Sequence, residues 1–347
     1  MKKIVLLFVA ICSVLTASAQ TSESQEKGFF KHLDASLTMG TTGLGLDVAS
    51  PMGEYAQLRA GFSFMPHIHY TMSFGVQVGD DPAKSESKFQ KLSGYLKQVT
   101  GYDVDNSIDM IGVPTFYNFN LLVDVFPFKN NKHWHFTAGF YWGNSQIGKA
   151  YNTTEDMTSL MAVGIYNTVY DKIKNYDPFY EDDSRVIYPN IPPEIEQAFK
   201  NYGRMGIAVG TYTHDIYGVF PRTEYDDEGN KLHEAGEYGV IHHKGDPYMM
   251  EPGQDGMAKA WVTANSFKPY VGFGYGGRLI KGNDKLKVSF DCGLMFWGGT
   301  PSIVTHDGTD LANDVENIKG KVGDYVDLIK GVKAFPVLNV RFTHTIF

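Results

Sequence analysis

Three pairs of histidines come nearest to metal chemistry in this sequence: His67 with His69, His133 with His135, and His242 with His243. Residues two apart in a strand share one face, so an imidazole pair at that spacing can chelate a metal ion. No Cys or Glu lies at ligand spacing from the first pair, the second pair lies beside a turn, and Gly and Lys flank the third in a loop. We therefore expect no metal site.

Other catalytic and cofactor motifs are incomplete. The segment GFGYGG at 272–277 lacks the helix and the Lys-Ser/Thr of a phosphate loop, and the acidic residues 226–228 lack the spaced ligands of an EF-hand. Neither Gly-x-Ser-x-Gly nor His-Glu-x-x-His occurs. Spacing leaves open a Ser–His pair that only the fold would assemble. The sequence predicts a protein that is not an enzyme and needs no cofactor.

The first residues predict export. Lys2 and Lys3 precede an apolar run at 4–15, and Ala-Ser-Ala at 17–19 is a small-residue cleavage signature, which is typical of a signal peptide over 1–19. The bulky Ile11 before Cys12 argues against a lipoprotein signal, so the mature chain keeps only Cys292 and no internal disulfide.

Composition excludes two classes of protein. Removing Lys2 and Lys3 changes the formal charge from -8 to -10, and basic residues form no cluster, which argues against nucleic-acid binding. No later segment has the long uncharged apolar run of a membrane helix. A membrane location would therefore require strands.

Alternating polarity predicts those strands. In 116–128, Tyr117, Phe119 and Leu121 fall on one face, and Asn118, Asn120 and Asp124 on the other. The same period of two predicts strands near 32–40, 43–50, 55–75, 115–128, 133–147, 258–280, 285–298 and 335–347. A transmembrane barrel needs this alternation, with apolar side chains toward lipid and polar ones toward the lumen.

Charged residues fall on the polar faces of the predicted strands. As candidates for the lumen of a barrel we take Asp34, Asp47, Arg59, Asp124, Lys287, Asp291 and Arg341. In a soluble β-sandwich the same residues would face water, and alternation alone does not separate the two folds. The signal peptide, the aromatic strand ends and the terminal Phe347 favour the membrane barrel.

Connection lengths predict the orientation and the number of strands. Short connections near 51–54, 129–132 and 281–284 alternate with long ones at about 76–115, 148–257 and 299–334, as expected for periplasmic turns and outer loops. Eight antiparallel strands result if residues 32–50 form a hairpin with a turn at 40–43. The alternative is ten strands, with a further hairpin from 205–212 and 258–264.

The segment 148–257 is an acidic insertion in the single barrel domain expected over 20–347. It contains 19 Asp and Glu against 9 Lys and Arg, and 12 of the 21 tyrosines. Helices are predicted near 85–99, 156–175, 192–202 and 310–330. We interpret the segment as a folded cap over the barrel mouth; the alternative is a tyrosine-rich surface that binds an extracellular ligand or protein.

Four strand blocks resemble the Bacteroides-type outer-membrane β-barrel proteins. The matching segments are GTTGLGLDVASPMGEYAQLRAGFSFMP, LLVDVFPFKNNKHWHFTAGFYWG, FKPYVGFGYGGRL and the ending FPVLNVRFTHTIF. The resemblance implies a barrel in the outer membrane of a Gram-negative bacterium. It brings no site residues, because most members have no assigned function.

The sequence thus predicts an all-β outer-membrane barrel with long, partly helical outer loops and a structural or surface-interaction role. With charges inside an eight-stranded barrel, we expect a plugged lumen. The alternatives are a narrow pore or transport protein, and a soluble exported β-sandwich. The expected partners are the lipid bilayer, the barrel-assembly machinery and a ligand or protein at 148–257, with no nucleic acid.

Overall fold

The structure is a computed structural model of the whole chain. It describes residues 32–346 except 80, 129–130, 175–178, 183–184, 188–200, 222, 226–229, 319 and 332. The expected signal peptide at 1–19 lies outside the described residues, as does most of the helix expected at 192–202.

Eight antiparallel strands close into a barrel. In order around it they are β1 (Asp34–Gly40), β2 (Gly43–Pro51), β3 (Ala56–Phe64), β6 (Tyr117–Val125), β7 (Trp134–Gly143), β18 (Phe267–Ile280), β19 (Asn283–Phe296) and β22 (Ala334–Thr345). The barrel closes where β1 pairs with β22, from Asp34 opposite Thr345 to Gly40 opposite Asn339. The prediction of eight strands is confirmed, and the soluble β-sandwich is wrong because the sheet has no open edge.

The hairpin between β1 and β2 makes the strand number even. Gly40 pairs with Gly43 across the turn. Gly43 has a φ of 90°, a backbone conformation that residues other than glycine rarely adopt. A Cβ at Gly43 would also lie 2.1 Å from the carbonyl oxygen of Phe64. Glycine is therefore required where the turn passes close to β3.

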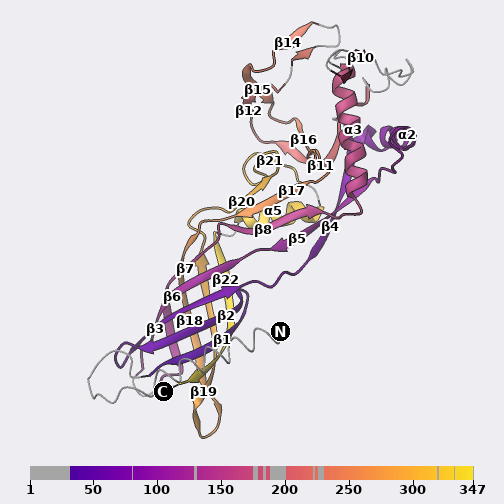
Figure 1. Cartoon of the computed structure of the whole chain (residues 1–347). Coiled ribbons are helices and arrows are strands. Elements are labelled where there is room, and N and C mark those ends of the chain that lie inside the picture. The colour runs from indigo at the N-terminus through magenta and orange to yellow at the C-terminus, as the bar shows by residue number, and fades with distance from the viewer. Residues whose placement is uncertain are drawn as a thin grey trace.

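A second sheet lies beyond one end of the barrel (Figure 1). Its strands, in order, are β16 (Pro247–Met250), β11 (Met205–Tyr212), β4 (Tyr70–Val78), β5 (Ser107–Pro114), β8 (Gln146–Asn152), β17 (Lys259–Thr263) and β20 (Ser302–Thr305), and β21 (Val315–Glu316) pairs with β11. We call this sheet, with the helices and hairpins attached to it, the head.

The head continues the barrel strand by strand. Five neighbouring barrel strands are each followed or preceded along the chain by a strand of the head: β3 by β4, β6 by β5, β7 by β8, β18 by β17 and β19 by β20. The five head strands are neighbours in the same order as their barrel counterparts. Short irregular segments separate the two sheets. The segment 65–69 contains Pro66 and the segment 297–301 contains Gly298, Gly299 and Pro301, and these residues interrupt a hydrogen-bonded ladder.

Several expected boundaries differ for this reason. The strands expected at 55–75, 133–147 and 258–280 each divide between the two sheets, and β20 follows the strand expected at 285–298. The ten-strand alternative is wrong, because 205–212 and 259–263 pair within the head. The segment 148–257 contributes three strands to the head sheet, β8, β11 and β16, rather than forming a separate loop.

The described residues of the head include the helices α2 (Pro82–Thr100), α3 (Met157–Lys174) and α5 (Gly320–Gly331). The first two lie where helices were expected. Only the second half of the helix expected at 310–330 is helical, because 310–314 forms turns and Val315–Glu316 pairs with β11. Asp81 caps α2 by accepting a hydrogen bond from the Ala83 amide at 3.0 Å, with Pro82 in the first turn.

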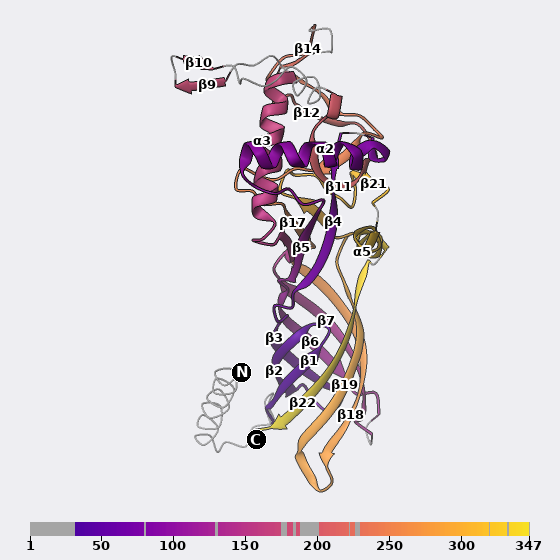
Figure 2. The same cartoon turned by 90° about the vertical axis from the view of Figure 1, so that its right-hand side faces the viewer.

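Small hairpins extend from the far end of the head (Figure 2). They pair β9 (Phe179–Asp182) with β10 (Arg185–Ile187), β12 (Ile216–Val219) with β15 (Tyr238–His242), and β13 (Glu224–Tyr225) with β14 (Lys231–His233). The head has apolar cores inside the sheet, around Ile108, Met110 and Ile207, and between α2, α3 and β11.

Candidate functional site in the barrel lumen

The charged residues of the lumen form one buried network. Arg59 of β3 donates to Asp124 of β6, with Nη2 2.9 Å from Oδ1, and its Nη1 lies 3.5 Å from Oδ2 of Asp291 on β19. Arg341 of β22 lies between the same carboxylates, with Nη1 3.4 Å from Asp124 Oδ2 and Nε 3.2 Å from Asp291 Oδ2. All four side chains are at most 7% exposed. Two guanidinium groups and two carboxylates therefore balance in charge.

The network reaches across the full width of the barrel. In the ring of eight strands, β3 is four places from β19, and β6 is four places from β22. Arg59–Asp291 and Arg341–Asp124 therefore connect strands on opposite walls. Eight strands leave an interior that side chains can fill, and these two ion pairs span it.

Neutral side chains and a third carboxylate, that of Asp47, complete the network. Thr137 of β7 donates to Asp124 at 2.7 Å, and Arg341 donates to Ser289 at 3.0 Å. Asp47 accepts from Thr38 at 2.5 Å and from Asn120 at 3.0 Å. The carboxylates are thus held by several strands at once, as buried charges require.

The structure separates two of the expected lumen residues from the others. Asp34 accepts a hydrogen bond from Thr345 at 2.6 Å and lies 3.7 Å from Lys287 Nζ. The Lys287 side chain is 46% exposed. Asp34 is the first residue of β1 and Thr345 the last of β22. This pair belongs to the end of the barrel that is remote from the head.

His135 belongs to the network, although the sequence analysis placed it at a turn. Its Nε2 lies 2.7 Å from Asp291 Oδ1, and the residue is 3% exposed. The alternation of 133–143 gave the signal, since His135 shares the polar face with Thr137. His133 instead contacts the Gly276 carbonyl oxygen through Nδ1 at 2.6 Å.

The glycines at 272–277 provide space in the lumen. A Cβ at Gly274 would lie 2.4 Å from the His135 ring and 2.5 Å from Asp291 Oδ1. A Cβ at Gly272 would lie 2.3 Å from the Tyr270 hydroxyl. The motif that resembles a phosphate loop is therefore part of a strand whose inward positions must stay small.

A buried lysine and an apolar cluster lie at the end of the barrel that adjoins the head. Lys268 is 0% exposed, and its Nζ contacts three neutral oxygens, those of Asn118 Oδ1, Ser266 O and Asn144 O, at 3.3–3.4 Å. It also lies 5.5 Å from the centre of the Phe116 ring. The apolar cluster consists of Phe116, Leu122, Tyr141, Tyr270, Met295, Trp297 and Val337. It lies between the charged network and the head.

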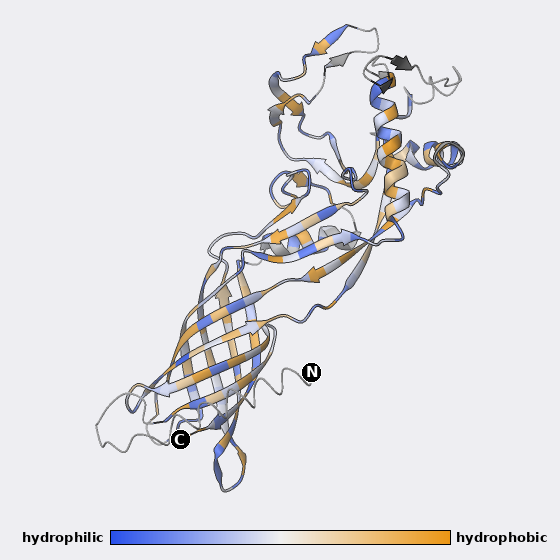
Figure 3. Cartoon of the chain, in the orientation of Figure 1, coloured by the Kyte–Doolittle hydropathy of each residue, from blue (hydrophilic) through white to orange (hydrophobic). Residues whose placement is uncertain are grey.

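The outer surface of the barrel is apolar. Phe136, Trp142, Val271 and Phe290 are each at least 51% exposed, and hydrophobic and hydrophilic residues alternate along the strands in Figure 3. Trp134 and Trp142 lie eight residues apart on β7, about 26 Å along the strand or about 20 Å along the axis at a tilt of about 40°. This height suits an apolar band of about 25 Å between aromatic girdles.

The first histidine pair lies outside the strands. His67 and His69 lie in the irregular connection between β3 and β4, so the shared face of a strand does not apply to them. Among the described residues, no three or more His, Cys, Asp or Glu side chains are grouped so that they could hold a metal ion. No described helix is long and apolar enough to span a membrane.

Comparison with known proteins gives distant structural similarity alone. No family model matches the sequence, and no curated protein matches. Acinetobacter baumannii CarO2 is 12% identical, with a TM-score of 0.37, over 92% of this chain and 100% of that one. A. baumannii CarO has a TM-score of 0.34 at 12% identity, over 90% and 96% of the two chains. The P. putida toluene transporter TodX has a TM-score of 0.18 at 12% identity, over 91% and 71%.

Proposed function

We propose that this chain is an outer-membrane β-barrel with a sealed lumen, which anchors the head at the cell surface for a structural or interaction role. The apolar band around a closed barrel supports insertion into a lipid bilayer, because a closed barrel leaves no unpaired backbone edge in the membrane. The expected signal peptide supports export. Insertion then depends on the bilayer and on the barrel-assembly machinery as partners.

Three of the four short connections in the barrel support the orientation, and the fourth, the β1–β2 turn, lies at the end toward the head. The β2–β3, β6–β7 and β18–β19 connections lie at the end opposite the head, where β22 also ends (Figure 1). Short turns are periplasmic in barrels of this kind. The head then lies outside the cell.

The main support for a sealed lumen is the set of ion pairs that cross it. Arg59, Asp124, Asp291 and Arg341 are 0–6% exposed, so they are almost completely shielded from solvent. Widening the lumen there would separate buried opposite charges, at a cost of several kcal/mol. An apolar cluster then covers the end toward the head.

The second candidate is a narrow pore or transport protein. One observation favours it: the lumen is lined by polar and charged side chains, as an aqueous path requires. In this function the network would act as a constriction.

Conductance separates the two functions. We expect the purified chain, reconstituted in planar bilayers, to show no steady single-channel openings. An Arg59→Ala/Arg341→Ala variant should leak, because it removes both cations that cross the lumen. Steady openings of the unmodified chain would contradict the sealed barrel and support the pore.

Fractionation tests the membrane location separately. We expect the chain in the outer-membrane fraction, with a gel mobility that changes on boiling in detergent. A soluble chain whose mobility does not change with heating would overturn the whole proposal.

A further inference from the structure

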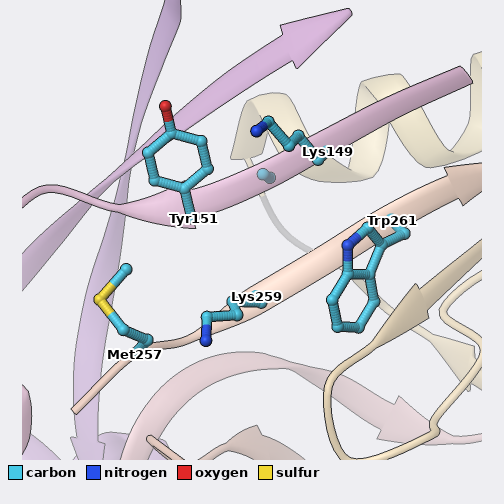
Figure 4. Close-up of a pocket in the computed structure, with 6 residues that line it drawn as sticks. Lys149, Tyr151, Met257, Lys259 and Trp261 are labelled. Carbon is cyan, nitrogen blue, oxygen red and sulfur yellow. The ribbon is translucent and has the colours of Figure 1, made fainter. Parts of the chain in front are cut away.

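A shallow pocket of about 280 Å³ lies on the head between β8 and β17. Its lining consists of Lys149, Ala150, Tyr151, Met257, Lys259 and Trp261. Figure 4 shows the two lysines and two aromatic side chains that β8 and β17 bring together around it. This site is separate from the lumen network.

The strand register arranges cations and aromatic rings alternately. Tyr151 is paired with Lys259, and Lys149 with Trp261. Residues two apart on a strand share a face, so all four side chains lie on one face of the sheet. Each lysine therefore has an aromatic neighbour across the strands and another along its own strand.

The opposite face of the same strands is anchored. Ala260 is 8% exposed within the apolar core of the head, and Ala150 and Val262 pack against that core. A strand whose other face is packed keeps a fixed backbone position. The pocket is thus a preformed platform rather than a mobile loop, which lowers the cost of binding.

Lys149 is a cation without a carboxylate partner in the described part of the chain. It is exposed, and its Nζ lies 5.4 Å from the centre of the Tyr151 ring. Lys259 differs, because it forms an ion pair with Asp255. In a chain with a formal charge of -8, an unneutralised ammonium beside two aromatic rings is suited to attract an anion.

We propose that this pocket binds an acidic saccharide, a sugar ring that carries a phosphate or carboxylate group. The faces of Trp261 and Tyr151 offer apolar surface to the C–H face of the ring, and Lys149 pairs with the anionic substituent. A pocket of this size is below the range of about 300–1,000 Å³ for drug-sized ligands, so it suits one ring or the end of a chain. The inference rests on the proposed function in one respect: the head must lie at the cell surface.

An acidic saccharide can reach the pocket from two sources. Lys149 is six residues beyond the end of β7, at most about 20 Å of extended chain from the barrel. An acidic sugar linked to a lipid of the outer leaflet can extend that far, and a free acidic oligosaccharide can arrive from outside.

The test measures binding to the detergent-folded full chain by calorimetry and tryptophan fluorescence. The soluble probes are an oligogalacturonate and, as the neutral control, maltohexaose; the lipid-linked probe is a vesicle with lipopolysaccharide, against a vesicle of phosphatidylcholine alone. We expect binding to an acidic probe and none to its neutral counterpart. Preference for the lipopolysaccharide vesicle over the oligogalacturonate assigns the lipid-linked source, and the reverse assigns the free one.

Matched variants localise the binding. We expect Lys149→Gln to weaken it about two- to fivefold and Trp261→Ala about tenfold, whereas Lys149→Arg and Trp261→Phe keep most of it. Lys91→Gln changes an exposed lysine on α2 and should have no effect. Equal binding by wild type, Lys149→Gln and Trp261→Ala, or no binding to either acidic probe, would overturn the inference.

The heat-dependent gel shift is measured on the same samples. Absence of binding by a chain that shows the shift rejects the saccharide site and leaves the barrel proposal intact. Absence of the shift in a chain that still binds rejects the barrel proposal and not the site.

Discussion

The barrel and the head contain strands that follow one another in sequence, yet they place opposite chemistry inside. In the barrel, Asp124 and Arg59 are 0% and 4% exposed, whereas Phe136 and Trp142 on the outer face are 61% and 62% exposed. In the head, the apolar Ile108 and Ile207 are both 0% exposed, and Lys149 lies on the outer face. Five barrel strands connect directly to neighbouring head strands.

The reversal indicates what surrounds each part. Alternating polar and apolar residues give a strand two different faces, and the surroundings determine which face points inward. Apolar side chains face outward where lipid is proposed, and inward where water surrounds the head. The change occurs within the few irregular residues between the sheets, so the boundary of the proposed membrane lies there. Substitutions placed on equivalent faces of the two parts test this comparison.

The largest effect is expected from Asp124→Ala in the lumen. This substitution leaves Arg59 and Arg341 buried with Asp291 as their remaining carboxylate, and losing one partner of a buried ion pair costs about 3–5 kcal/mol. Urea unfolding of the barrel in lipid vesicles, followed by the heat-shift gel, measures the loss.

Asp284→Ala is the control for that measurement. Asp284 pairs with Arg278, and the two side chains are 74% and 61% exposed. Such a pair contributes about 0–1 kcal/mol. Similar losses for the two variants would show that the lumen network does not stabilise the barrel.

A smaller effect is expected from Val271→Arg on the outer face. Val271 pairs with Ala138, midway between Trp134 and Trp142 along β7, and an arginine at the middle of a bilayer costs about 2–4 kcal/mol in a barrel. The matched change on the head is Tyr238→Arg, at a side chain that is 70% exposed. It should change stability by less than about 0.5 kcal/mol. Equal tolerance of the two arginines in vesicles would contradict a lipid-facing surface at Val271.

The sequence predicted the barrel because its signals are local. A period of two, short polar turns and the glycines at 40 and 43 act over a few residues, and they predicted eight strands and a hairpin at the first turn. The same parity placed Arg59, Asp124, Asp291 and Arg341 on one face. That these residues form ion pairs between opposite walls of the barrel became apparent only from the order of the strands in the closed barrel.

The head was missed because its pairings are not local. β11 pairs with β4, far away in the sequence, and no nearby turn marks that contact. Single spanning strands were predicted where the structure has β3 followed by β4, and β17 followed by β18, since both members of each pair alternate in polarity. Lys268 was missed although it lies in phase with Gly272 and Gly274, which marks the inward face of β18.

The smallest effect concerns pH and is confined to the head. Asp307 follows β20 and accepts hydrogen bonds from the Thr305 hydroxyl at 2.6 Å, the Tyr248 hydroxyl at 2.9 Å and the Thr309 amide at 3.0 Å. Burial acts to raise the pKa of this carboxyl, but the hydrogen bonds outweigh it and hold the pKa below its usual value of 3.8. The charged form is therefore favoured by folding. Its contribution is present above the pKa of the unfolded chain and is lost as the pH falls through the lower folded pKa.

Asp307→Asn should remove this part of the pH dependence. Between about pH 5 and pH 2 we expect the unfolding temperature of the wild-type head to fall by about 1–2 °C more than that of the variant, because partly exposed polar interactions contribute little. Hydrogen exchange of the β20 amides reports on the head without the barrel. Tyr248→Phe keeps the carboxyl but removes one donor, so the pKa of Asp307 should move toward its usual value, by less than removal of all three donors would cause. If Asp307→Asn follows the wild-type pH profile, this carboxylate does not make the stability of the head depend on pH. The difference between barrel and head would then lie only in the side chains on their inner faces.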